Sequence, residues 1–312
     1  MKTLPALLLA VWASATGPHA QTTTGKPRVL VFFGCGGAVH ASIPYINAVW
    51  QKLAAVEGLE IDTTRLPTVF TGTNLARYAA VLWNNATHPG KVLDSSQRAA
   101  WLAYGRTGGY VGMHAAGDAS DTWPDYSSYM GGTNSQHSNT LPATLYIEPG
   151  GEAARHPILL HAGWPASLTL ADEWYSWRIN PRLKPGIKVL YSLDEKTFTP
   201  GVAMGEDHPI MWVRESAEGG RMVYMGMGHN IDLFKPELAK GYAEMEKLMR
   251  ASLLWAIKRI PVEGVALVPQ APGSRKPSGE RAWTRQQGFD LSGRALPWDA
   301  PSAAYPSETR IP

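Results

Sequence analysis

Three histidines in this 312-residue sequence each follow a short apolar stretch. His40 comes after RVLVFF and a run of glycines, His114 comes directly after YVGM, and His229 comes after MVYMGMG. In open α/β sheets, ligands bind beyond the carboxyl ends of the strands. We therefore expect the three imidazoles to share one site, as proton-transfer groups or as ligands of a divalent metal.

The stretch YVGMHAAGD, residues 110–118, has the pattern of a nucleophile elbow, a sharp turn that lifts one side chain out of a sheet. Such elbows carry Ser, Cys or Asp at the apex, whereas this one carries His114. An imidazole there suits proton transfer or metal ligation better than acyl transfer. Asp118 predicts either a helix N-cap or a carboxylate that orients an imidazole or binds a ligand.

Further candidate residues lie in the second half of the chain, where Asp172-Glu173-Trp174-Tyr175 combines two acids with two aromatics. This tetrapeptide suits polyol binding and is equally typical of a packed turn. The predicted site consists of catalytic His114, His229, Asp118 and Glu173, substrate-binding Trp174, Tyr175, Asp207 and His208, and metal ligands His40, His114, His137 and His229. His88 and His156 each precede a proline and are predicted to be structural.

Several motifs are missing from the sequence. It has neither HExxH nor CxxC, so a metal would need ligands that converge from separate loops. It also lacks GxGxxG and GxxxxGK[ST], which disfavours a nucleotide cofactor. The net charge is only +3 and no Lys/Arg run occurs, so no nucleic acid partner is expected.

The composition is that of a globular protein, with 44% hydrophobic and 18% charged residues. Twelve Trp, twelve Tyr and six Phe give a heavy aromatic content, part of which could stack on sugar rings. Cys35 is the single cysteine, so no intramolecular disulfide can form. The oligomeric state cannot be predicted from these features.

Residues 1–20 have the features of a secretory signal peptide. Lys2 precedes an apolar run at 4–13, and small residues suitable for cleavage follow. The run is too short to span a bilayer as a permanent helix. We expect an exported, periplasmic protein without membrane insertion.

Residues 26–260 are predicted to form one α/β domain. Expected strands and helices alternate in its first part, at 28–33, 43–59, 59–64, 78–84, 95–105 and 110–113. Short strands and a long helix follow, at 143–148, 187–193, 210–214, 221–225 and 238–258. The alternation predicts a mainly parallel, flavodoxin-like sheet flanked by helices. Residues 261–312 form a Pro- and Ser-rich extension, expected to be partly ordered at Trp283 and Trp298.

In their order and spacing, these motifs resemble the ThuA-like (trehalose utilisation) family, which has a class I glutamine amidotransferase-like fold. The resemblance covers roughly residues 28–258. It rests on RVLVFF with His40-Ala-Ser42-Ile43, Leu93-Asp94 with Gln97-Arg98, Gly109 to Asp118, Asp172 to Tyr175, Asp207-His208-Pro209-Ile210 with Trp212, and Gly228-His229. The family usually has Arg before the first histidine, where Val39 stands here.

The resemblance implies a change of chemistry at the elbow. In class I amidotransferases the elbow holds a nucleophilic Cys, and a His after a late strand is its base. Here His229 matches the base, but the apex is His114, and Cys35 lies at the end of the first strand. An imidazole does not replace a thiolate in forming a glutamyl thioester, so amidotransfer is disfavoured.

The family's link to sugar catabolism, often beside sugar 3-dehydrogenases, implies a carbohydrate substrate such as a 3-keto-glycoside. A ketone at C3 acidifies the C2 proton, so a base can remove it and expel the C1 substituent by β-elimination. This reaction needs a base and an electrophile that holds the enolate oxygen. We therefore expect a lyase or hydrolase acting on oxidised sugars. The alternatives are a non-catalytic exported sugar-binding protein and, third, a cysteine hydrolase that uses Cys35.

Overall fold

The computed structural model describes residues 25–118, 123–238, 241–261, 288–289 and 295–296. The predicted signal peptide at 1–20 lies outside these residues, as do Trp283 and Trp298. The chain divides into two units, Met1–Ala266 and Leu267–Pro312. In the second unit, Gly288–Phe289 (β10) pairs antiparallel with Ala295–Leu296 (β11). Among the described residues, no helix is both long enough and apolar enough to cross a membrane.

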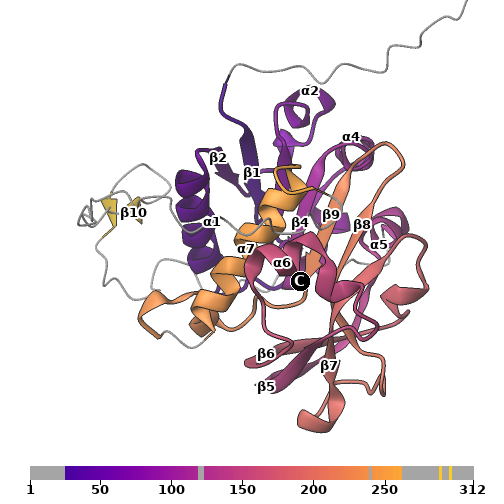
Figure 1. Cartoon of the computed structure of the whole chain (residues 1–312). Helices are drawn as coiled ribbons and strands as arrows, with labels where there is room; N and C mark the ends of the chain where they lie inside the picture. The colour runs from indigo at the N-terminus through magenta and orange to yellow at the C-terminus, as the bar shows by residue number, and fades with distance from the viewer. Residues whose placement is uncertain (1–24, 119–122, 239–240, 262–287, 290–294, 297–312) are drawn as a thin grey trace, which may run out of the picture. The chain divides into compact units, whose positions relative to one another are not determined.

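A nine-stranded sheet in the order β2-β1-β3-β4-β9-β8-β7-β5-β6 forms the first unit (Figure 1). The first five strands in this order are parallel, and we call them the parallel half: β2 (Glu60–Thr64), β1 (Arg28–Phe32), β3 (Ala80–Asn84), β4 (Gly109–Met113) and β9 (Arg221–Met225). The other four pair antiparallel and form the antiparallel half: β8 (Pro209–Glu215), β7 (Lys188–Asp194), β5 (Asn134–Ile147) and β6 (Ser167–Trp177). The α/β fold agrees with the sequence prediction, but the sheet is mixed.

Within the parallel half, β1, β3, β4 and β9 are buried on both faces because helices cover each face, whereas the edge strand β2 is partly exposed. Successive residues of a strand point to opposite faces, so Val29 and Val31 pack on one side and Leu30 and Phe32 on the other. The first face contacts α1 (Ile43–Glu57), α6 (Pro157–Ala162) and α7 (Tyr242–Ala256). The second contacts α2 (Gly72–Leu75), α4 (Ser95–Gly105) and α5 (Pro124–Met130). This two-sided burial explains the continuous apolar runs in the sequence.

Local signals fix the ends of the helices. A capping box starts α4, in which Asp94 accepts from the backbone of Gln97 and the Gln97 side chain accepts from the backbone of Asp94. Gly58 ends α1 in the left-handed conformation, with φ of 64°. The short helix α3 (Pro89–Val92) has a proline in its first turn. These contacts hold the loops between strands in place.

The antiparallel half differs most from the prediction. Strand β5 begins at Asn134, nine residues before the expected start, because polar residues pair with β6 through two register shifts. Strand β6 was not predicted at all, and it contains the acidic and aromatic tetrapeptide that was interpreted as a turn or a sugar-binding segment. The tetrapeptide is therefore extended chain, whose alternate residues point to opposite faces.

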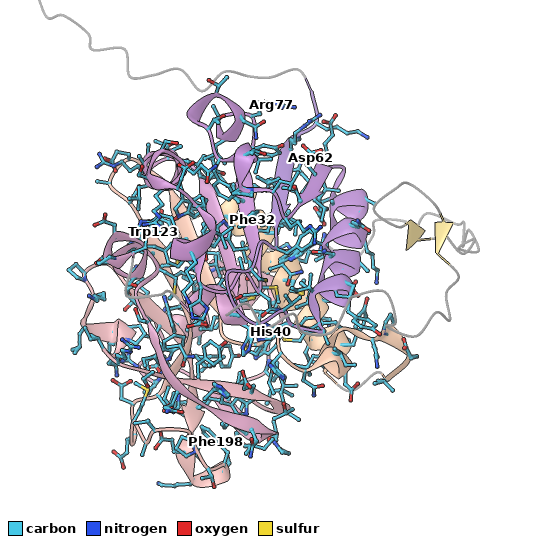
Figure 2. The ribbon with its side chains drawn as sticks, turned by 180° about the vertical axis from the view of Figure 1, so that it is seen from behind. Phe32, His40, Asp62, Arg77, Trp123 and Phe198 are labelled. Carbon is cyan, nitrogen blue, oxygen red and sulfur yellow. The ribbon has the colours of Figure 1, made fainter. Side chains whose placement is uncertain are left out.

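The carboxyl edge of the parallel strands faces the antiparallel half. Figure 2 shows His40 between Phe32 at the end of β1 and Phe198 in the antiparallel half. Although β6 is last in the strand order, Glu173 from this strand lies 3.3 Å from His114, which directly follows β4. The antiparallel half must therefore curl back to the carboxyl edge, which places side chains from both halves around one point.

Candidate functional site

Four side chains converge at this edge: His40, His114, Glu173 and His229. One donor atom from each lies within 4.8 Å of the corresponding atoms of the other three. The three imidazole rings pack edge to face, with centroids 5.0–5.5 Å apart. We call these four residues the histidine–glutamate cluster. The structure thus brings together the three histidines that follow β1, β4 and β9, as their positions in the sequence suggested.

His114 is the apex of the elbow that follows β4. Its φ of 42° is uncommon for a residue with a side chain, and it begins a single 3-10 turn (η2, His114–Gly117). Its carbonyl accepts from Tyr224 Oη at 2.8 Å, and its Nδ1 donates to Gly226 O at 3.0 Å. A carbonyl can only accept, so Nδ1 carries a proton, and Nε2 is the ring nitrogen that faces the cluster.

Glu173 joins the histidines. Its Oε2 lies 3.3 Å from His114 Nε2 and 3.4 Å from His229 Nδ1, and its Oε1 lies 3.0 Å from His137 Nδ1. Burial opposes ionisation of Glu173, but contacts with His114 and His229 hold its pKa well below the ordinary value. In turn, the carboxylate raises the pKa of His229 against the effect of burial. The cluster therefore holds a carboxylate that requires a positive partner.

His40 is electrostatically different from His229. Burial, together with the neighbouring His114 and His229, lowers its pKa to about 3. Its Nδ1 is buried and has no hydrogen-bond partner among the described residues. At neutral pH this imidazole is uncharged, and such a ring can bind a metal or accept a proton.

A polar scaffold fixes the segments that carry the histidines. Ser42 Oγ donates to Gly228 O at 2.5 Å, and Asn85 Nδ2 donates to the same carbonyl at 3.1 Å. Asn85 Oδ1 accepts from Ala115 N at 3.2 Å, so one amide links the end of β3 to the elbow and to the loop after β9. Gly228 is required here because a Cβ would lie 2.7 Å from His114 Cβ.

Asp172 on β6 anchors the loop of His229 that follows β9. This fully buried carboxylate accepts the backbone N–H groups of Gly228, His229 and Asn230 at 2.7–3.0 Å, together with that of Glu173. Burial raises its pKa, while the backbone N–H groups act in the opposite direction. Asp172 therefore positions the loop of His229 and does not face ligand.

The histidine–glutamate cluster fits a divalent metal. Imidazole and carboxylate are common ligands of zinc, iron and manganese, and in a tetrahedral zinc site neighbouring donor atoms lie about 3.4 Å apart. His114 shows the arrangement typical of a metal ligand, since its other ring nitrogen donates to a backbone carbonyl. Its Nε2 has no hydrogen-bond partner and lies 3.3 Å from Glu173 Oε2, so a cation between these two atoms would satisfy both. Glu173 takes the place in the ligand set that the sequence analysis gave to His137.

Three other predicted residues lie around the cluster. Tyr175 packs on His114, with ring centroids 4.3 Å apart. His137 has about half of its side chain exposed, and its Nδ1 lies 3.0 Å from Ser138 O as well as from the outer oxygen of Glu173. Asp118 lies 3.2 Å from His88 Nδ1 and follows the 3-10 turn of the elbow, so it does not cap a helix.

The remaining predicted substrate-binding residues have other partners. Trp174 is fully buried, and its indole donates to Leu141 O. Asp207 pairs with Arg182 at 2.8 Å. His208 is fully buried, with Nδ1 2.8 Å from Glu195 Oε1 and Nε2 2.8 Å from Tyr175 O. The structure therefore does not place these three at the cluster.

Cys35 lies in the loop after β1, outside the cluster. Its thiol donates to the backbone carbonyls of Phe33 and Asn85 at 3.4 and 3.3 Å. A thiol that donates to carbonyls is not activated as a thiolate. The arrangement gives no support to a cysteine nucleophile.

Sequence analysis missed Ser42, Asn85 and Asp172 as positioning residues. Ser42 and Asp172 lie within motifs quoted for the family resemblance, but nothing in their spacing indicates that they bind the loop at Gly228. Asn85 follows the end of β3, and this position next to an expected site was the available signal. Their partners lie 30 to 186 residues away along the chain.

The fold and the site define an α/β protein with a histidine–carboxylate cluster at the carboxyl edge of a mixed sheet. Residues 28–256 match the ThuA family, described as trehalose utilisation. The chain belongs to this family. No curated protein matches the sequence.

Two solved ThuA-like structures share the fold. A ThuA-like protein from Bacteroides uniformis is 23% identical with a TM-score of 0.61, covering 80% of this chain and 98% of its own. Another, from Parabacteroides merdae, is 16% identical with a TM-score of 0.55, covering 78% of this chain and 94% of its own. The glutaminase domain of CTPS from Trypanosoma brucei is 9% identical with a TM-score of 0.41, and the match covers 73% of this chain and 94% of that domain.

Proposed function

We propose that this chain is a carbohydrate-active lyase or hydrolase that cleaves oxidised (3-keto) glycosides with the help of a divalent metal. The observation that carries the proposal is the histidine–glutamate cluster, where ring nitrogens of three histidines without a hydrogen-bond partner among the described residues converge with a carboxylate. Family membership in trehalose utilisation supports a sugar as substrate. The sequence of residues 1–20 supports export to the periplasm.

In this proposal His40, His114, Glu173 and His229 hold the metal. A bound divalent metal supplies a Lewis acid that polarises the carbonyl oxygen at C3 of the sugar. Tyr175 packs on His114 and fixes the orientation of its ring. The half-exposed His137 lies at the outer side of Glu173, where it can contact sugar hydroxyl groups.

The reaction itself is an elimination. Removal of the C2 proton next to the ketone allows the C1–O bond to break, and addition of water to the unsaturated product gives net hydrolysis. A group that removes this proton needs a free lone pair near the cluster but outside the metal ligands.

The test uses purified protein stripped with a chelator and reloaded with zinc, manganese, iron, cobalt or nickel separately. We expect about one metal ion per chain and release of nitrophenol from a p-nitrophenyl 3-keto-glucoside with at least one metal. The unoxidised glucoside is the substrate control and should remain intact. Absence of cleavage under every metal condition would contradict the proposal.

Variants separate catalysis from binding. His114→Ala should lose the metal and the cleavage, whereas His161→Ala, on the exposed surface of α6, should retain both. If the protein binds the keto-sugar without turnover, and His114→Ala binds it equally well, the non-catalytic sugar-binding alternative is correct.

A further inference from the structure

His88 and Asp118 form a second histidine–carboxylate pair at the same edge of the sheet. His88 follows β3, which lies between β1 and β4 in the sheet, and these two strands lead to His40 and His114. Neighbouring strands are about 4.8 Å apart, so the loops that leave their carboxyl ends lie side by side. Backbone hydrogen bonds confirm this, because Gly36 N donates to Thr87 O at 2.8 Å in the loop that leads to His40.

Two contacts fix His88 against Asp118. The backbone N–H of His88 donates to Asp118 O at 3.1 Å, and His88 Nδ1 lies 3.2 Å from Asp118 Oδ2. Nδ1 makes no hydrogen bond in this geometry, but the negative charge beside it favours the tautomer that carries the proton on Nδ1, which leaves the lone pair on Nε2. About 30% of the His88 side chain is exposed, which leaves the ring accessible.

The backbone of His88 is strained. It is left-handed, with φ of 47° and ψ of 57°, although it carries a bulky side chain and precedes Pro89. Asn85 and His114 also have positive φ, so three of the four such non-glycine residues in the described chain lie at this edge. Strained residues cluster at functional sites, where the surrounding structure holds them. A purely structural histidine before proline would not require this conformation.

Asp118 also connects the pair to the cluster. It ends the turn that begins at His114, and its charge, like those of Glu173 and Asp172, acts on Tyr175. Tyr175 in turn packs on His114 at 4.3 Å. The pair therefore lies near the metal ligands but does not belong to them.

We propose that His88 is the base that removes the C2 proton of the keto-sugar and that Asp118 is its positioning residue, an inference that rests on the proposed function. His88 Nε2 accepts the proton, and the C–H electron pair forms a C2–C3 double bond as the carbonyl pair moves to the C3 oxygen. When that pair returns, C1–C2 becomes a double bond, the C1–O bond breaks, and the departing oxygen takes the proton back from His88. The products are an unsaturated keto-sugar and an alcohol, with no oxidant or reductant consumed.

The test compares His88→Asn with the wild-type protein on p-nitrophenyl 3-keto-glucoside. Asn tolerates the left-handed conformation and can cap a helix, so the fold should be retained while the base is lost. We expect kcat to fall about 10²- to 10⁴-fold, with metal content and thermal midpoint unchanged. Added imidazole should restore part of the activity of His88→Ala but should leave the control His161→Ala unaffected.

Asp118→Asn tests the positioning role. The Asn amide no longer holds the Nδ1–H tautomer, so kcat should fall at least 10-fold, with KM unchanged and metal retained. Deuterium at C2 should slow the wild-type reaction, because that proton is transferred in the step assigned to His88.

The outcomes distinguish this inference from the proposed function. If the wild-type protein cleaves the substrate and His88→Asn does so within threefold of its rate, the base assignment is wrong and the proposed function stands. If His88→Asn loses the metal, His88 supports the metal site and is not the base. If the wild-type protein cleaves nothing with any metal, the proposed function fails and the assignment fails with it.

Discussion

The two halves of the sheet contribute to the site in different ways. The parallel half places His40, His114 and His229 in loops that directly follow strands, where the carboxyl ends of β1, β4 and β9 meet. The antiparallel half contributes Glu173 from the interior of β6, whose curvature brings it back to that edge. The placement of the three histidines follows from a general rule for open sheets, whereas the placement of Glu173 depends on the shape of one particular strand pair, β5 and β6.

Replacement of Glu173 tests whether the antiparallel half completes the site. Glu173→Gln removes the charge that faces His114 and His229, so we expect metal affinity to fall more than about 100-fold and cleavage to be lost. Calorimetric titration of the stripped protein with the metal measures this. Glu195→Gln is the matched control, because Glu195 pairs with His208 away from the cluster, and its metal affinity should be unchanged. Wild-type affinity in Glu173→Gln would mean that the parallel half forms the site alone.

Replacement of Asp172 tests how firmly the two halves are joined. Asp172→Asn loses a carboxylate that accepts four backbone N–H groups, and it places an amide N–H₂ against donors. The free energy of unfolding should fall by about 2–4 kcal/mol. Denaturant unfolding measures the change, with Asp207→Asn as an exposed control that costs about 1 kcal/mol or less. Equal effects of the two substitutions would argue against a joining role for Asp172.

The parallel half could largely be predicted from sequence. Helix α4 and strand β9 have the expected bounds, Ser95–Gly105 and Arg221–Met225, because a capping box marks one and an apolar run the other. The convergence of the three histidines could also be predicted. Each histidine follows a parallel strand, and the carboxyl ends of parallel strands lie at one edge of the sheet whatever the strand order. His88 was predicted to be structural because a proline follows it, and its contact with Asp118 at the same edge was not predicted.

The antiparallel half could not be predicted to the same extent. Strand β6 alternates imperfectly, and its buried Asp172 breaks the apolar pattern that would have indicated a strand. Glu173 was selected for its acidic side chain, but its contacts with His114 and His229 depend on pairing between segments more than 50 residues apart. Trp174 was expected at the substrate, yet alternation along β6 places it in the core. Residue types can be read from the sequence, whereas the curvature and register of the strands decide which side chains come into contact.

His156 gives a contrast to the charged histidine of the cluster, because it is buried against Trp255 without a carboxylate. Burial, together with the positive charges of Lys188 and Arg221, lowers its pKa to about 4. Its unfolded pKa is about 6.5, so between pH 6.5 and 4 the unfolded chain binds the proton and the folded chain does not. Stability should therefore fall as pH decreases through this range, by up to about 1.4 kcal/mol per pH unit.

His156→Asn keeps an N-cap for α6 and removes the titrating ring. Denaturant unfolding at pH 6.5, 5.5 and 4.5 should show a smaller loss of stability in this variant than in the wild-type protein. Identical pH dependence of the two proteins would show that His156 is protonated in the fold and does not contribute to the slope.

The smallest predicted effect concerns the packing of the loop after β1 on the loop after β3, both within the parallel half. A Cβ on Gly37 would lie 2.7 Å from His88 Nδ1, so Gly37→Ala must displace the ring from Asp118, while no backbone strain arises. We expect kcat to fall about 10-fold, because a small displacement of a proton-transfer group weakens catalysis, with a stability change below about 1 kcal/mol. Gly72→Ala, where a Cβ meets open space, should leave both unchanged. An unaltered rate in Gly37→Ala would show that the contact between these loops does not set the position of His88. Of the contacts tested between segments, only that of Glu173 with the histidines would then be important for the site.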